Sequence, residues 1–359
     1  MKTRSAIFTF ATLARSPFLK TLFATPVRSP FSTILIATLL LTAFSTASAQ
    51  TDEVKLDPAR TRITALPAVP VRRAPKASGK EITRLKLGTI VSVVARNSKM
   101  ELDAGKLDYW DRINLPNGES GWVSGGRLRD YYPGGRAETL KEIIEYLLEN
   151  DHFMAGETEF ANWEEIYNLA SNSIAETEDA NTRAEFELLK LLVLRQWAWK
   201  LPNGEEDESP HPEWLKAHAA EIIPNESGSG YQLRSELLWN LEAKNHSLPI
   251  ADRIAWEAAE NPLPSECEND AVCQFLADED FSKYLSLHPN GEHVAEALKN
   301  LNEVLTDDVI AAANSAGGDE NAVAKRTQLK KQLAQLRVAL EKVSAPEKAE
   351  LVKKLGRVK

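Results

Sequence analysis

The sequence changes character at Pro133-Gly134-Gly135, and this change constrains the fold more than any other feature. Before it, residues 65–132 contain short segments rich in β-branched and aromatic side chains, which Gly, Asn and Pro separate, as in short strands joined by turns. After it, apolar residues recur every three or four positions, as in amphipathic helices. Two different periods in one chain predict a multidomain α+β protein, with a small β-structure first and helices after it.

Within residues 65–132, strands are expected at 82–85, 89–94 and 109–113. Asn117-Gly118 predicts a tight hairpin, because both central residues of the favoured two-residue turn need positive φ. Short strands over about 65 residues predict a small β-barrel closed around one apolar core.

The order of several motifs in this segment resembles the bacterial Src-homology-3 domain. That family has a Val-Arg pair in its first strand, a Leu-x-x-Gly turn, and a Trp-x-x-Val strand that runs through a Gly turn into Gly-Trp-Val. The matching residues here are Val71-Arg72 with Pro75, Leu87-Gly88-Thr89-Ile90, Tyr109-Trp110-Asp111-Arg112-Ile113, Asn117-Gly118 and Gly121-Trp122-Val123. Ile113 replaces the usual Val, and the insertion 98–107 is longer than the family usually carries. The resemblance covers residues 65–132 and implies a small Src-homology-3-like β-barrel.

The resemblance also implies binding, to cell-wall peptide or to a partner protein, without chemistry of its own. Aromatic residues that lie close in sequence could form a groove for an extended peptide, because flat rings bury apolar area at low entropy cost. The candidates are Tyr109, Trp110, Trp122 and Tyr132, with Tyr131 beside them. The alternative is that these side chains belong to the core of so small a barrel, and this alternative is strongest for Trp122.

Residues 136–306 are predicted to be a helical domain. Segment 183–201 is apolar on more than one side, which predicts a central helix. The motif Tyr284-Leu285, Pro289-Asn290-Gly291 and Ala295-Glu296-Ala297-Leu298 resembles a tetratricopeptide-type helix turn, but no 34-residue period is found. We therefore expect an irregular helical bundle or a degenerate helical repeat. Its helices are predicted at 137–149, 163–170, 183–201, 213–223, 231–245, 251–260, 275–287 and 292–305.

The end of the chain is predicted to be a flexible linker, 307–324, and an amphipathic helical segment, 325–359. Apolar residues are spaced alternately by four and three, as in a coiled-coil seam. The seam lasts only about two heptads, and convincing coiled coils have three to four. We expect this helix to dock on the body of a monomer or to stay partly free, and self-association is the alternative. The seam residues are Leu329, Leu333, Leu336, Leu340 and Val343.

Residues 1–49 have the three parts of a secretory signal. Basic residues without acids precede an apolar run at 31–44, and Ala47-Ser48-Ala49 then offers the small residues that a signal peptidase needs. Cleavage is predicted between Ala49 and Gln50, followed by a linker over 50–64. The apolar run is shorter than the roughly 20 residues that span a bilayer, although an uncleaved anchor is the alternative. The protein is expected to be periplasmic or secreted, with no integral membrane segment after signal removal.

The charge of the mature chain argues against one class of partner. The whole sequence has 43 basic and 52 acidic residues, for a net charge of −9. Loss of the signal removes five basic residues and takes the net charge to −14. Such a surface repels phosphates, so no nucleic-acid partner is expected.

Cys267 and Cys273 are the only two cysteines. In an oxidising compartment an isolated pair is most simply a disulfide. A zinc site with His288 and His293 is the alternative, but the cysteine spacing exceeds the usual two to four residues. A Cys/His nucleophilic pair would need a free thiolate. We predict the disulfide, with no metal and no cofactor.

No motif for catalysis is found: the chain lacks a nucleophile elbow, a phosphate-binding loop and a His-Glu-x-x-His zinc motif. Glu164-Glu165 could serve glycoside hydrolysis only at a fixed separation in a cleft. The sequence therefore predicts a non-enzymatic binding and scaffolding protein of the bacterial envelope. In this hypothesis the barrel binds a peptide or peptidoglycan and the helical domain binds a protein. The alternative is a peptidoglycan hydrolase that uses the barrel for targeting.

Overall fold

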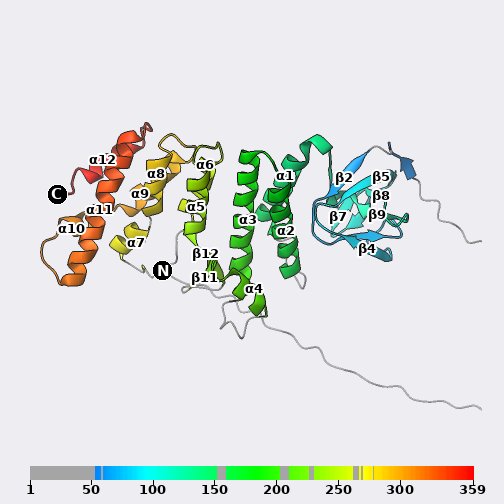
Figure 1. Cartoon of the computed structure of the whole chain (residues 1–359), viewed down its shortest axis with the longest axis horizontal. Coiled ribbons are helices and arrows are strands. Elements are labelled where there is room, and N and C mark those ends of the chain that lie inside the picture. The colour runs from blue at the N-terminus through cyan, green and yellow to red at the C-terminus, as the bar shows by residue number, and fades with distance from the viewer. Residues whose placement is uncertain are drawn as a thin grey trace, which may run out of the picture. The chain divides into compact units, whose positions relative to one another are not determined.

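The computed structural model describes residues 53–57, 60–151, 159–202, 210–225, 230–261, 267, 270–277 and 279–359. The predicted signal and its cleavage position at Ala49-Gln50 lie outside the described residues. Residues 51–359 form one unit by their contacts. Antiparallel strands come first, blue and cyan in Figure 1, and helices follow, which confirms the predicted α+β class.

The N-terminal strands pair antiparallel around an apolar cluster that includes Val71, Val93, Ile113 and Val123. The strands are β1 (Glu53–Lys55), β2 (Thr61–Thr64), β3 (Val69–Arg72), β4 (Glu81–Leu85), β5 (Ile90–Asn97), β6 (Glu101–Asp103), β7 (Lys106–Asp108), β8 (Trp110–Asn114), β9 (Ser120–Ser124) and β10 (Leu128–Asp130). The main sheet has the order β10-β2-β5-β8-β9-β3-β4, and β1 also pairs with β5. Among the described residues this pairing is a path with two ends, so it does not show the predicted barrel closure.

The predicted Asn117-Gly118 hairpin differs from expectation in its turn type, and a tight two-residue hairpin lies elsewhere. The Asn117-Gly118 hairpin is present between β8 and β9, but only Gly118 has positive φ, at 82°. Gly118 N donates to Leu115 O at 3.0 Å, which closes a turn with Pro116 in its second position, a place that proline favours. Positive φ at both central residues occurs instead at Ala104 (47°) and Gly105 (82°), between β6 and β7. This is the requirement of the tight two-residue hairpin turn.

The predicted linker over 50–64 is incorrect, because it contains two strands. Residues 61–64 form β2, which pairs with β5 and with β10, and residues 53–55 form β1. Strands of three or four residues show too little alternation to be recognised as strands before their partners are known. The strand-rich region therefore begins before residue 65.

Helices make up most of the remaining described residues. They are α1 (Arg136–Glu149), α2 (Glu159–Glu176), α3 (Ala180–Lys200), α4 (Pro212–His218), α5 (Ser235–Asn245), α6 (Ala251–Ala259), α7 (Ala271–Ala277), α8 (Glu279–Leu287), α9 (Val294–Val304), α10 (Asp307–Asn314), α11 (Glu320–Lys342) and α12 (Lys348–Leu355). The predicted helices at 213–223 and 231–245 are each shortened by a strand. These strands, β11 (Ile222–Pro224) and β12 (Tyr231–Leu233), pair with each other.

Helix α3 occupies the central place that its sequence predicts. Its residues Leu188 and Leu192 belong to a large apolar cluster formed with the later helices. Phe186, Leu189 and Val193 belong to a second cluster, which is formed with α1 and α2. A helix that is buried on two sides needs apolar residues around most of its circumference, as this one has.

The second cluster also includes Ile63, Leu87 and Tyr131 of the strand-rich region. Glu165 of α2 strengthens the same junction, because its Oε2 accepts hydrogen bonds from Leu87 N at 3.0 Å and Ala68 N at 3.4 Å. The strand-rich region and the first helices therefore share an apolar core and a carboxylate that accepts from the backbone.

The predicted linker over 307–324 is incorrect, because it contains α10, which begins at an N-cap, Thr306, and the first turn of α11. Val309, Ile310 and Ala313 of α10 are buried, and the small residues that indicated flexibility instead favour a helix. Helix α11 follows and packs on α8, while α12 packs on α9 and α11. All five residues of the predicted seam are buried, so this face is docked on the protein itself.

None of the helices in the described part of the chain combines the length and apolar character that a bilayer-spanning helix needs.

Candidate binding surface

The four aromatic candidates do not share one environment. Trp110 and Trp122 are almost completely buried. They lie on β8 and β9, two inner strands with a paired neighbour on each side. We therefore correct the prediction for these two residues: they belong to the interior, because a small domain has few other large apolar groups with which to fill its core.

Tyr132 is exposed and Tyr109 is half-buried. Tyr109 lies near the Arg96 guanidinium, whose carbon is 5.7 Å from the ring centroid, a cation–π distance. Tyr131, between the strands and α1, is buried in the cluster shared with the helices. Tyr132 and the half-buried Tyr109 remain candidates for contact with a ligand.

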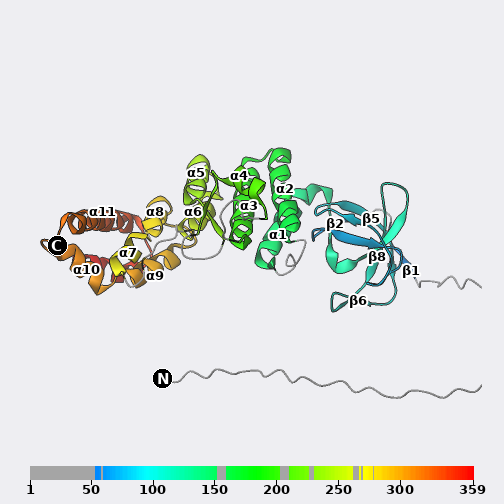
Figure 2. The ribbon, with the colours of Figure 1, turned by 90° about the horizontal axis from the view of Figure 1, so that it is seen from below.

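The hairpin of β6 and β7 is the most apolar exposed element of the strand-rich region. Leu102 and Leu107 are directly opposite each other in the register, and their exposed fractions are 58% and 66%. Met100 precedes them and is also exposed. Figure 2 shows β6 at the margin of the strand-rich region. Contiguous exposed apolar side chains are typical of surfaces that bind a partner.

Ion pairs and hydrogen bonds hold the hairpin at its base and its tip. Arg127 Nε contacts Asp103 Oδ2 at 2.8 Å, next to the turn. Burial raises the pKa of Asp103, but hydrogen bonds and nearby charges, chiefly those of Arg127, outweigh it and leave this pKa below its ordinary value. Asp108 Oδ2 accepts from Ser124 Oγ at 2.7 Å and from Gly126 N. The leucines are thus exposed on a hairpin that is fixed at both ends.

A buried carboxylate fixes Arg96 beneath Tyr109. Asp111 has no exposed surface and pairs with Arg62 at 2.6 Å and with Arg96 at 2.7 Å. The hydrogen bond to Asp111 is the main cause of the raised pKa of Arg96. Two guanidinium groups on one buried carboxylate stay charged and ordered, so the Tyr109 ring has a fixed cation as its neighbour.

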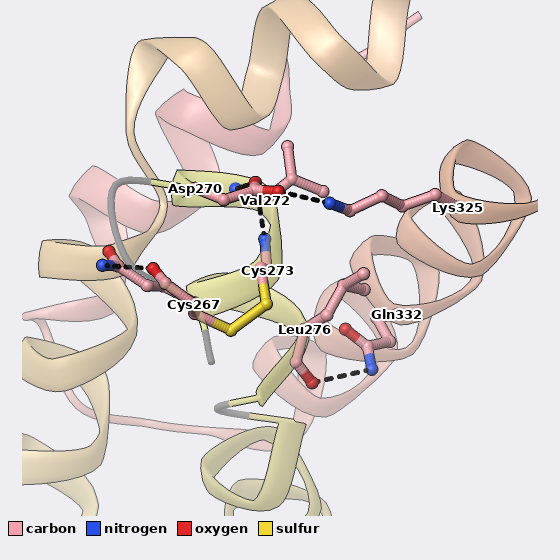
Figure 3. Close-up of a disulfide and its surroundings, with 8 residues drawn as sticks. Cys267, Asp270, Val272, Cys273, Leu276, Lys325 and Gln332 are labelled. Carbon is pink, nitrogen blue, oxygen red and sulfur yellow. Dashed lines mark hydrogen bonds and ion pairs between the residues drawn. A yellow bond between two sulfur atoms is a disulfide. The ribbon is translucent and has the colours of Figure 1, made fainter. Parts of the chain in front are cut away.

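Cys267 and Cys273 are joined by a disulfide, with their Cα atoms 5.3 Å apart, as the sequence predicts (Figure 3). Asp270 Oδ1 accepts from Val272 N and Cys273 N, both at 3.0 Å, at the start of α7. Lys325 of α11 pairs with the same carboxylate, and its hydrogen bond is the main cause of the lowered pKa of Asp270. The disulfide therefore ties Cys267 to α7, while the Asp270–Lys325 ion pair links the start of α7 to α11. The two sulfurs are unavailable to a metal or a substrate.

Sequence reasoning missed Leu102 and Leu107, although it identified the segment 98–107 as an insertion. Their symmetry about Ala104-Gly105 could have predicted this pair. Two apolar residues at equal distance from a two-residue turn become opposite partners in a hairpin.

Comparison with protein families gives one match to the strand-rich region. Residues 67–129 match the family model described as the bacterial SH3 domain. The match does not extend into the helices, so it gives the predicted tetratricopeptide-like character no support. Searches of the curated proteins and of the solved structures found no match to this chain. The motifs, the antiparallel strands and the family model agree that residues 67–129 are a bacterial SH3 domain.

Proposed function

We propose that this chain is an exported binding and scaffolding protein of the bacterial envelope, whose SH3 domain binds a peptide or peptidoglycan. The observation that carries the proposal is the exposed Leu102–Leu107 pair on an anchored hairpin of this domain. A ligand that covers these side chains buries apolar area without first having to order the hairpin, so little binding energy is lost.

The disulfide supports the exported location, because disulfides form and persist in oxidising compartments outside the cytoplasm. The secretory signal predicted for residues 1–49 agrees with it. A domain family that binds cell-wall peptide has its ligand in the same compartment.

The helical region supports the scaffolding part of the proposal. A groove of 750 Å³ lies between α8 and α11, lined by residues that include Lys283, Gln332, Gln335 and Val338. Its charged and amide side chains resemble the polar, partly solvated rim of a protein–protein interface. In this proposal the SH3 domain holds the chain at the wall while the helices bind a second protein.

A pull-down with purified peptidoglycan tests the wall-binding proposal. The wild-type protein should sediment with the polymer, and the double variant Leu102→Ala, Leu107→Ala should bind at least about tenfold more weakly, because each leucine contributes roughly 1.5–3 kcal/mol when it is buried. Val323→Ala is the matched control, since Val323 is an exposed apolar residue on α11, outside the SH3 domain. Trp110→Ala is a poor probe because Trp110 is buried and its loss would unfold the domain.

Three results would contradict the proposal. The wild-type protein would remain in the supernatant if the SH3 domain has no wall ligand. The control would weaken binding as much as the double variant if the hairpin is not the contact. Soluble wall fragments released during the incubation would favour the peptidoglycan hydrolase instead.

A further inference from the structure

A carboxylate and two imidazoles converge at the ends of α5 and α8, far in sequence from the SH3 domain. Glu242 and His246 are four residues apart at the end of α5, a spacing that places both side chains on one face. His288 follows the last residue of α8. One oxygen of Glu242 and one ring nitrogen from each histidine all lie within 4.8 Å of one another.

The distances within this cluster are short. Glu242 Oε1 is 2.5 Å from His246 Nδ1 and 3.1 Å from His288 Nε2. A tetrahedral ion with bonds of about 2.0–2.2 Å holds its ligand atoms roughly 3.4 Å apart. The three atoms therefore need only a small outward movement to coordinate one ion.

Burial makes the charge of Glu242 significant. Its side chain is 4% exposed and that of His288 is 12% exposed. Among the described residues, the ion-pair partners of Glu242 are these two imidazoles, and no Lys or Arg joins them. A buried carboxylate is costly without a positive charge beside it, and an imidazole carries one only when it is protonated. A divalent cation would supply the charge and use the nitrogen lone pairs of both neutral rings.

A carboxylate lies near the second ring nitrogen of His288, beyond hydrogen-bond distance in this structure. This nitrogen, Nδ1, lies 4.0 Å from Asp252 Oδ1. Ligating histidines commonly have a carboxylate near the nitrogen that does not bind the metal, and this carboxylate orients the ring. Asp252 is itself held by Tyr284 OH at 2.8 Å and by Glu292 N at 2.9 Å.

Gly291 makes this arrangement possible. A Cβ atom at this position would lie 2.0 Å from Asp252 Oδ1 and 2.4 Å from Tyr284 OH. Any other residue would force the Asp252 carboxylate and the Tyr284 hydroxyl, or the turn itself, to move. The Pro289-Asn290-Gly291 turn therefore positions the carboxylate that stands behind His288.

We propose that Glu242, His246 and His288 form a binding site for a single Zn²⁺ ion. Two histidines and one glutamate are a known zinc ligand set in which the fourth position stays open. Here the opening lies beside His246, whose side chain is 55% exposed. Water or a group from a partner protein would complete the coordination.

The site differs from the zinc alternative in the sequence analysis, although both include His288. The two cysteines of that alternative form a disulfide. His293 instead pairs with Glu296 at 2.9 Å and stacks on Trp256, with ring centroids 4.5 Å apart.

Titration of the chelator-stripped protein with Zn²⁺, followed by calorimetry, tests the proposal. The wild-type chain should bind one ion. Glu242→Gln and His246→Ala should each weaken Zn²⁺ binding by more than about 100-fold. Loss of a carboxylate that only orients a ligand lowers metal affinity roughly 10–100-fold, and loss of a ligand itself costs more. Asp252→Asn should show that smaller loss. Co²⁺ in place of Zn²⁺ adds an absorption spectrum that reports the nitrogen and oxygen ligands.

His218→Ala is the matched control, because His218 also contacts a carboxylate, Glu221, at 2.5 Å but does not belong to the three-residue cluster. It should bind Zn²⁺ like the wild type. The exposed position of His246 makes His246→Ala decisive if Glu242→Gln fails to fold. A wild-type protein that binds no Zn²⁺ would overturn the site, and so would His246→Ala or a folded Glu242→Gln that binds it as tightly as the wild type.

Discussion

Asp280 is a residue whose environment opposes its charge. Its Oδ1 accepts a hydrogen bond from Trp239 Nε1 at 3.0 Å, and Lys283 lies over the same indole ring. Burial outweighs these favourable neighbours and raises the pKa of Asp280 from 3.8 to about 6. The folded protein therefore binds a proton here more readily than the unfolded chain does. The contribution of this carboxyl to stability is greatest below about pH 4 and is lost as the pH rises to about 6.

Asp280→Asn should consequently stabilise the protein above pH 6. The gain should be about 1 kcal/mol, since the side chain is partly solvated and the full shift overstates the effect. The amide oxygen can still accept from Trp239 Nε1. Urea unfolding at pH 7.5, 6.0 and 4.5 measures the difference, which should shrink toward pH 4.5. Glu341→Gln, at an exposed carboxyl, should show no such trend, and an equal gain for Asp280→Asn at every pH would contradict the argument.

Single residues also show the limit of sequence reasoning. The disulfide between Cys267 and Cys273 could be predicted, because compartment and cysteine count determine it without knowledge of the fold. The burial of Trp110 and Trp122 could not be settled from the sequence, because an aromatic residue in a short strand can belong to a core or to a groove. Which role it takes depends on the neighbouring strands, and these come from distant parts of the sequence.

At the scale of elements, the predictions were correct where the apolar pattern repeats over several helical turns. Segments 183–201 and 292–305 are helices, as expected from several turns of apolar spacing. Strands β11 and β12 have three residues each and cannot show a period. Residues 307–314 fall within the predicted linker over 307–324, but a helix needs only one apolar stripe, and Val309 and Ile310 provide it.

The seam of α11 gives a prediction at the same scale. Leu336 is fully buried against the helical body, so Leu336→Ala should lower the free energy of unfolding by about 2–5 kcal/mol. Val338, two residues later, is exposed, and Val338→Ala should change stability by less than about 0.5 kcal/mol. Urea unfolding measures both. If the seam instead joined two chains, the stability of the wild-type protein would rise with protein concentration.

At the scale of the whole molecule, the junction between the SH3 domain and the first helices matters most. Ile63 and Leu87 share an apolar cluster with α1, α2 and α3, and Glu165 accepts from Leu87 N and Ala68 N. Sequence analysis treated the two parts as separate domains, because contacts between segments about 80 residues apart leave no local pattern. A shared core predicts that both parts unfold in one transition.

Glu165→Ala should lower the free energy of this transition by about 1–3 kcal/mol, because two backbone N–H groups lose their acceptor. Glu164→Ala is the matched control, since Glu164 is exposed on the same helix. Thermal unfolding should be followed by far-ultraviolet circular dichroism for the helices and by tryptophan fluorescence. Two separate transitions in the wild type, or equal effects of the two variants, would refute a common core.

The β6–β7 hairpin forms a two-stranded sheet of its own, and neither strand pairs with a third among the described residues. Such a sheet has two outer edges, where an incoming extended chain can form main-chain hydrogen bonds whatever its side chains are. Main-chain hydrogen bonds alone would accept any extended chain. Leu102 and Leu107 would then favour chains whose side chains pack against them. The same edges also allow a second copy of the protein to add its hairpin at high concentration. Glu101 and Lys106 place a charge on each strand, and charges of this kind commonly limit edge-to-edge addition.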